Sequence, residues 1–99
     1  MFDSLIDNLN ADKWLETDMA AKNDEWKEYH VMRHHRFVDN TTLVVMVAPE
    51  DGEARNVEVK DCQANKDPLK EIGSIELLLN AEETEVIGID LNGDVVIRK

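Results

Sequence analysis

Residues 42–60, TLVVMVAPEDGEARNVEVK, contain the clearest fold signal in the chain. The run over residues 42–48 is continuously apolar and rich in β-branched side chains, which predicts a strand buried on both faces. The Pro-Glu-Asp-Gly sequence that follows is typical of a turn. Over residues 54–60 apolar and polar residues alternate, which places Val57 and Val59 on one face of a second strand that pairs back as a hairpin.

The C-terminal part of the chain contains the strongest turn signal. Residues 85–91 and 94–98 are rich in β-formers, and between them stand Asn92 and Gly93, two residues that readily adopt positive φ. A hairpin is therefore expected here. A further strand is expected in the second half of residues 30–38, because an Asp-Asn turn signal follows it directly.

Helical spacing of apolar residues occurs in two longer segments. Asn10 is a typical N-cap residue, and a long helix is expected from residue 11 to about residue 29. A crossover helix is expected over residues 67–79, because Pro is favoured at the first helical position. Asp3 and Ser4 can cap a short helix before both. The apolar positions of the two longer patterns are Leu15, Met19, Trp26 and Tyr29, then Leu69, Ile72, Ile75 and Leu79.

These elements predict an α+β fold. The expected architecture is an antiparallel sheet of four to five strands, with the N-terminal helices and one crossover helix packed on one face. Residues 1–99 are expected to form a single acidic globular domain. Alternating strands leave at least one sheet edge unprotected by proline, so a homodimer through paired edges is a further expectation.

Charge excludes several classes of function. The 99 residues include 22 acids and 11 bases, a net charge of −11, and this disfavours direct binding to nucleic acid or to an anionic membrane. No apolar run approaches the ~18 residues of a membrane span. The Met-Phe-Asp start has no basic or apolar leader region, so we expect a cytoplasmic protein, in the host cytoplasm if the protein is phage-encoded.

Residues 30–37 form a short basic island that contains two arginines, all three histidines and no acid. On a helix His30 and His34 would share a face, a spacing that suits a two-ligand metal site. No Glu follows the first His, and a third ligand would have to come from a remote residue such as Asp39 or Cys62. In the alternative reading, His30, His34 and His35 form a polar sheet edge or a counter-charge for acidic neighbours. No metal or other cofactor is assigned.

Catalytic motifs are not found. Cys62 has no hydrolase signature around it and reads as a small buried hydrophobe, and the glycines form no phosphate-binding loop. The sequence from Asp90 to Asp94 resembles the start of a calcium loop, but the hairpin explains the same residues. We therefore expect a protein that is not an enzyme.

The acids gather in clusters that suit a partner-binding surface. On the expected N-terminal helix, carboxylates one turn apart lie ~5–6 Å from each other, comparable to the spacing of phosphates along a nucleic-acid strand. Such a surface can engage the basic groove of a nucleic-acid-binding protein. In the alternative reading the charge only keeps the protein soluble and monomeric. The candidate contacts are Asp12, Glu16, Asp18 and Glu25 on the helix, and Glu82, Glu83 and Glu85 after the crossover helix.

One short stretch resembles a known family. Ser74-Ile75, Leu77-Leu78, Glu82-Glu83 and residues 85–88 resemble a segment of the phage uracil-DNA glycosylase inhibitors, which are acidic proteins of helices and an antiparallel sheet. The resemblance is confined to this stretch and includes a gap. It has Gly73 where the family has an acid, and no site residue is carried over from it.

The function expected from the sequence is that of a small, acidic, non-enzymatic binding protein. It engages and inhibits a basic partner of the nucleic-acid-binding type, in the manner of small phage inhibitors, with the N-terminal acids as main contacts. Two alternatives remain open: a toxin-neutralising immunity protein, which would have the same profile, and a metal- or pH-responsive regulator built on the histidines.

Overall fold

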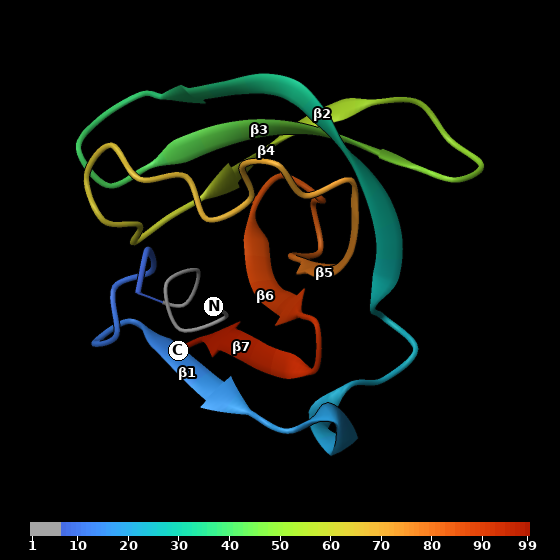
Figure 1. Cartoon of the computed structure of the whole chain (residues 1–99). Coiled ribbons are helices and arrows are strands. Elements are labelled where there is room, and N and C mark those ends of the chain that lie inside the picture. The colour runs from blue at the N-terminus through green and yellow to red at the C-terminus, as the bar shows by residue number, and fades with distance from the viewer. Residues whose placement is uncertain (1–6) are drawn as a thin grey trace.

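Seven strands account for the fold of residues 7–99, the part of the chain that this computed structural model describes (Figure 1). A single 3-10 turn, η1 (Met19–Ala21), interrupts them. All the strand pairs are antiparallel. The strands are β1 (Trp14–Thr17), β2 (Lys27–Phe37), β3 (Leu43–Pro49), β4 (Arg55–Val59), β5 (Ser74–Leu79), β6 (Val86–Leu91) and β7 (Asp94–Arg98).

The sheet curls until one of its edges returns to its middle. Its strand order is β1-β7-β6-β5-β2-β3-β4. The edge strand β4 comes back to the start of β6, where the amide of Glu58 donates to the carbonyl of Thr84 at 2.8 Å and an isolated parallel bridge joins Glu58 to Glu85. Figure 1 shows β3 and β4 crossing above β6 and β7. The return engages the β4 edge at Glu58, and among residues 7–99 no strand pairs with the outer edge of β1.

The core lies on the inner face of this curled sheet. Buried and less buried residues alternate along β3, β4 and β5, as the two-residue period of a strand requires. Burying these side chains supplies the main driving force for folding. The fully buried side chains of the strands are Leu43, Val45, Val47, Val57, Val59, Leu77, Val86, Ile89, Leu91 and Val95, with Leu9 and Leu69 from the connecting segments.

The longest strand, β2, contains a wide irregularity in its pairing with β3. Val31 lies opposite Val47 and His35 lies opposite Val45, so three β2 residues face the single β3 residue Met46. Insertions of this kind bend a strand and redirect its side chains. The first half of β2 pairs with both β3 and β5, whereas its second half turns away from β5.

The strands expected from local patterns are confirmed. Residues 42–48 and 54–60 correspond to β3 and β4, and Val57 and Val59 are buried on the same face. The expected C-terminal hairpin is β6 and β7, joined by Asn92 and Gly93 with φ values of 56° and 106°. Both residues therefore have the positive φ that this turn needs.

The α+β prediction is wrong, and the N-terminal helix is its first error. Residues 14–17 form β1 and pair with Val95–Arg98 of β7, and the second half of the expected helix includes the start of β2. Leu15 and Met19 are exposed rather than buried. Pairing with a strand distant in sequence overrides the local helical spacing. The cap expected at Asp3 and Ser4 lies outside the described residues.

The expected crossover helix over residues 67–79 is also wrong. Its first part forms turns, and its second part is β5, whose Ile75 and Leu77 are buried at alternate positions. Leu77 pairs with Lys27 on one side and Ile89 on the other, so β5 is an interior strand of the sheet. A short apolar run fits a helix or a strand equally well, and here the two neighbouring strands decide.

Gly88 marks a close approach in β6. A Cβ atom at this position would lie 2.7 and 2.9 Å from two ring atoms of Trp26 and 3.1 Å from Cβ of Leu78. Because the indole is rigid and Trp26 is buried, Gly88→Ala is expected to lower the free energy of unfolding by about 1–2 kcal/mol. Chemical denaturation measures this. Gly73→Ala, where an added Cβ meets no atom within 4 Å, is the control, and equal effects of the two substitutions would contradict the packing described here.

Candidate functional site

β1, the strand at one end of the sheet order, is fixed to the core by one buried side chain. Trp14 is only 4% exposed, and its indole Nε1 donates to the carbonyl of Lys60 at 2.9 Å, beyond the end of β4. The next residue, Leu15, is 53% exposed. The tryptophan therefore anchors a strand whose next two side chains, Leu15 and Glu16, are exposed.

The segment after β1 is fastened to the sheet by Lys22. Its ammonium group donates to Asp90 at 2.7 Å and lies 3.1 Å from the carboxylate of Glu76 and 5.6 Å from the ring centroid of Trp26. Burial acts to lower the pKa of Lys22, but its hydrogen bonds to Asp90 and Glu76 outweigh burial and raise the pKa. For Asp90 burial acts to raise the pKa, and the bonds from Lys22 and the Gly93 amide lower it on balance.

The lowered pKa of Asp90 has a consequence for acid stability. Because this pKa lies below the ordinary value of 3.8, the unfolded chain takes up a proton at Asp90 before the folded one does. The stabilisation is thus present above about pH 4 and is lost as the pH falls through the folded value. Asp90→Asn is expected to cost about 1 kcal/mol at neutral pH and to flatten the fall in stability below pH 4.

Denaturation between about pH 3 and pH 7 tests this expectation. Asp94→Asn is the matched control, because Asp94 is exposed in the next strand and forms no ion pair within residues 7–99. The role given to the Lys22–Asp90 pair would be contradicted if the free energy of unfolding of Asp90→Asn fell below about pH 4 as steeply as that of the native protein. It would also be contradicted if both variants changed this pH dependence equally.

The four acids expected on the N-terminal helix all lie between residues 12 and 25, in β1 and in the turns before and after it, and not on a helix. Asp12 lies in the turn before β1, Glu16 on β1, Asp18 before η1 and Glu25 in the turn before β2, and all four are exposed. Asparagine-capped turns shape the two ends, since Asn10 and Asn23 accept from the amides of Asp12 and Glu25. We call the set Asp12, Glu16, Asp18 and Glu25 the acidic edge.

The acidic edge lies beside exposed apolar side chains. Leu15 and Met19 are 53% and 47% exposed, and Glu16 and Asp18 lie between them along the chain. Within residues 7–99 Asp12, Glu16 and Glu25 form no ion pair with a basic side chain. The helical spacing of the sequence predicts that Leu15 and Met19 are buried, and this prediction is wrong. The strand pairing of β1 is the signal that reveals it.

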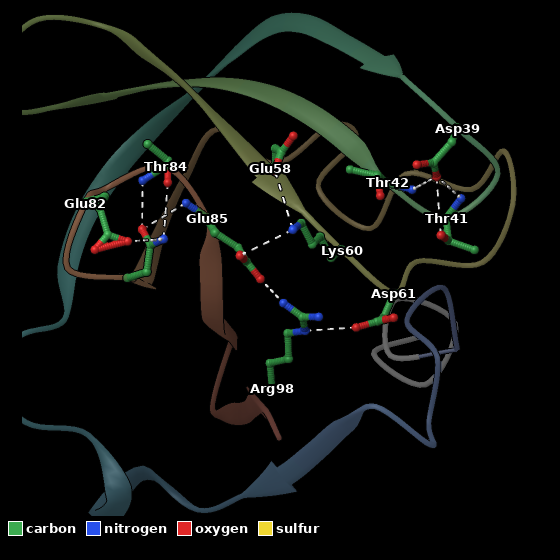
Figure 2. A network of polar contacts seen from close by, with 11 residues as sticks. Asp39, Thr41, Thr42, Glu58, Lys60, Asp61, Glu82, Thr84, Glu85 and Arg98 are labelled. Atoms are coloured by element: carbon green, nitrogen blue, oxygen red, sulfur yellow. Dashed lines mark hydrogen bonds and ion pairs between the residues drawn. The ribbon is translucent and has the colours of Figure 1, made fainter.

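The second expected cluster, Glu82, Glu83 and Glu85, is engaged inside the molecule. Glu83 forms an ion pair with Arg55. Glu85 forms ion pairs with Arg98 and, at 3.7 Å, with Lys60 (Figure 2). Glu82 accepts from the amide group of Asn80 at 3.4 Å. Arg98 also reaches Asp61 at 2.8 Å, so this network joins the end of β7 to the seam between β4 and β6.

The three histidines do not converge on one point. His30 and His34 are exposed on β2, whereas His35 is directed to Asp67, with its Nε2 2.6 Å from the carbonyl of Met32. Among residues 7–99 no group of three or more His, Cys, Asp or Glu side chains is placed to hold a metal ion.

Cys62 is a buried thiol, as expected from the sequence. It is 1% exposed, and its Sγ donates to the carbonyl of Val59 at 3.4 Å. Burial, reinforced by the charges of Asp67 and Asp61, raises the pKa of the thiol to about 12. The thiolate that a nucleophile needs is therefore scarce at neutral pH.

Two further observations bear on the class of protein. In the described part of the chain no helix has the length and apolar composition needed to cross a bilayer. Comparison of the chain with protein-family models, with curated proteins and with solved structures finds no match in any of the three.

Proposed function

We propose that this protein is a small, acidic, non-enzymatic binding protein that engages and inhibits a basic protein surface through the acidic edge. The partner class is a nucleic-acid-binding protein or a basic toxin, and the proposed compartment is the cytoplasm, the host cytoplasm if the protein is phage-encoded. The observation that supports it most is the exposure of four carboxylates between residues 12 and 25, one on β1 and three in the turns before and after it, in the same segment as exposed Leu15 and Met19.

The ion pairs separate the solvated carboxylates of Asp12, Glu16 and Glu25 from carboxylates that are paired inside the molecule. Elsewhere in the described chain Glu83, Glu85 and Asp90 are matched by Arg55, Arg98 and Lys22. A carboxylate already paired inside the molecule has less to gain from a cationic partner than a solvated one. Asp12, Glu16 and Glu25, which form no ion pair within residues 7–99, therefore stay available to an approaching basic protein.

Two exposed apolar side chains in the same segment add apolar contact area to it. Protein interfaces commonly combine a few desolvated apolar contacts with a polar rim that steers association. Leu15 projects from β1 and Met19 from η1, and the acids surround them in sequence. Burial of two such side chains on binding adds affinity that does not depend on salt.

The test compares three forms of the protein as bait in a lysate, with bound proteins identified by mass spectrometry. Asp12→Lys combined with Glu16→Lys is expected to lose a basic protein that the unmodified chain retains. The same charge change in Glu50→Lys and Asp51→Lys, exposed in the turn between β3 and β4, serves as the control and is expected to retain it. Thermal melts check that both variants fold.

Binding kinetics of the captured protein complete the test. Charge reversal at the acidic edge is expected to slow association by tenfold or more, since exposed charges act mainly on the on-rate. Affinity of the unmodified chain should fall steeply from about 50 mM to about 500 mM salt. Equal capture by all three baits, or an affinity that does not change with salt, would overturn the proposal.

A further inference from the structure

A groove of about 1010 Å³ lies on another part of the sheet, beside the second half of β2. One wall is residues 30–37 of β2, and the other is the segment 69–73 with Asp67. It opens because the pairing of β2 with β5 ends at His30 and Ser74, after which one more backbone bond joins Val31 to Gly73. From there β2 has no strand neighbour on this side within residues 7–99.

The rim of the groove is positively charged in an otherwise acidic protein. Arg33, Arg36 and Lys70 are exposed on it and form no ion pair within residues 7–99. Of the two acids on the walls, Asp67 is engaged by His35, which leaves Glu71 as the remaining acid. The exposed His30 and His34 add further hydrogen-bonding groups and no negative charge.

The floor of the groove is apolar. Leu43 and Leu69 are 1% and 0% exposed, and Phe37 and Ile72 are partly buried and pack against the core. All four side chains line the groove. A ligand seated here therefore meets cations at the rim and hydrocarbon below.

We propose that this groove binds an extended acidic peptide segment of a partner protein, with carboxylates at Arg33 and Arg36 and apolar side chains on the floor between Phe37 and Ile72. The volume is at the upper limit of small-molecule pockets, ~300–1,000 Å³, which favours a chain of several residues. Charge complementarity selects an acidic one, since the rim is cationic and its arginines present forks suited to carboxylates. A nucleic acid is disfavoured, because its binding needs many more neutralised phosphates than the three cations of the rim supply.

The experiment uses three synthetic peptides and the unmodified protein, with binding followed by titration calorimetry and by amide chemical shifts. The acetylated peptide Glu-Leu-Glu-Leu-Glu-Leu-Glu is expected to bind and to shift amides of residues 30–37 and 69–73. Replacing every Glu by Gln tests the charge, and replacing every Leu by Ser tests the floor. Each replacement is expected to weaken binding by tenfold or more.

Protein variants locate the site. Arg33→Glu with Arg36→Glu is expected to weaken peptide binding at least tenfold, whereas Lys13→Glu with Lys66→Glu, the same charge change at exposed positions outside the groove, changes it less than twofold. Arg33→Gln with Arg36→Gln repeats the test if charge reversal disturbs folding.

Three results would overturn the proposal: no peptide-induced shifts along the groove, equal binding of all three peptides, or tighter groove binding of an oligothymidylate of matched charge. This test is separate from that of the acidic edge, because neither set of variants replaces Asp12, Glu16, Asp18 or Glu25.

Discussion

Trp14→Ala is expected to lower the free energy of unfolding by about 3–5 kcal/mol, the cost typical of removing a buried tryptophan from a core. The side chain is 4% exposed and belongs to the main hydrophobic cluster. Its loss also leaves the carbonyl of Lys60 without the indole donor. Since β1 is a short strand at the sheet edge, its pairing with β7 is expected to weaken first.

Two measurements separate these effects. Trp14→Phe keeps the ring packing and removes the hydrogen bond, so it is expected to cost about 1–2 kcal/mol. Hydrogen exchange of the β7 amides of residues 95–98 should accelerate more in Trp14→Ala than exchange in β3. An alanine variant that is as stable as the native chain, or that exchanges uniformly faster in β3 and β7, would contradict the anchoring role of Trp14.

His35→Ala is expected to cost about 2–3 kcal/mol, the second largest effect among these substitutions. The His35 ring bonds to the Asp67 carboxylate through Nδ1 and lies 2.6 Å from the Met32 carbonyl through Nε2. Each ring nitrogen faces an oxygen atom, so His35 connects Asp67 to the backbone of β2. Without it, the largely buried Asp67 keeps the bond from the amide of Leu69 but loses its hydrogen bond with the His35 ring.

The same substitution is expected to alter the groove, because His35 links its two walls. Residues 69–73 should show faster hydrogen exchange in His35→Ala than in the native protein. His34→Ala, an exposed neighbour on β2, is the control and should change stability by less than about 0.5 kcal/mol. Equal melting temperatures for the two variants would refute the bracing role of His35.

Local chemistry determines the parts of the fold that the sequence predicts correctly. Asn92 and Gly93 form their turn because few residues accept positive φ, and this preference acts without distant partners. The β-branched run of β3 likewise disfavours a helix by itself. Val57 and Val59 alternate with polar neighbours, so the buried face of β4 can be read directly from the sequence.

β1 and β5 could not be recognised in this way. The residues of β1 form a strand because they pair with β7, and the sequence around Trp14 contains no signal that indicates this pairing. Leu15 and Met19 happen to lie at helical spacing, and they are exposed. For β5, Leu77 through Leu79 fit either period, and the choice depends on Lys27 and Ile89 on the neighbouring strands.

The candidate site shows the same division. The sequence predicts exposure for Asp12, Glu16 and Glu25 correctly, since their charge disfavours burial, but attributes their arrangement to a helix that does not form. It groups Glu82, Glu83 and Glu85 as a contact surface. Arg55 of β4 and Arg98 of β7 pair with Glu83 and Glu85, and only the folded chain brings these cations to them.

The pairing of the first strand with the last has a consequence for synthesis of the protein on the ribosome. β1 is made early, yet Trp14 has to wait for Arg98 and the rest of β7 before it gains its partner. Contacts this distant in sequence form slowly. During translation β1 therefore emerges as an unpaired strand with an exposed indole, while β2, β3 and β4 can already associate as a meander. The acidic edge is consequently completed only when the last strand has left the ribosome.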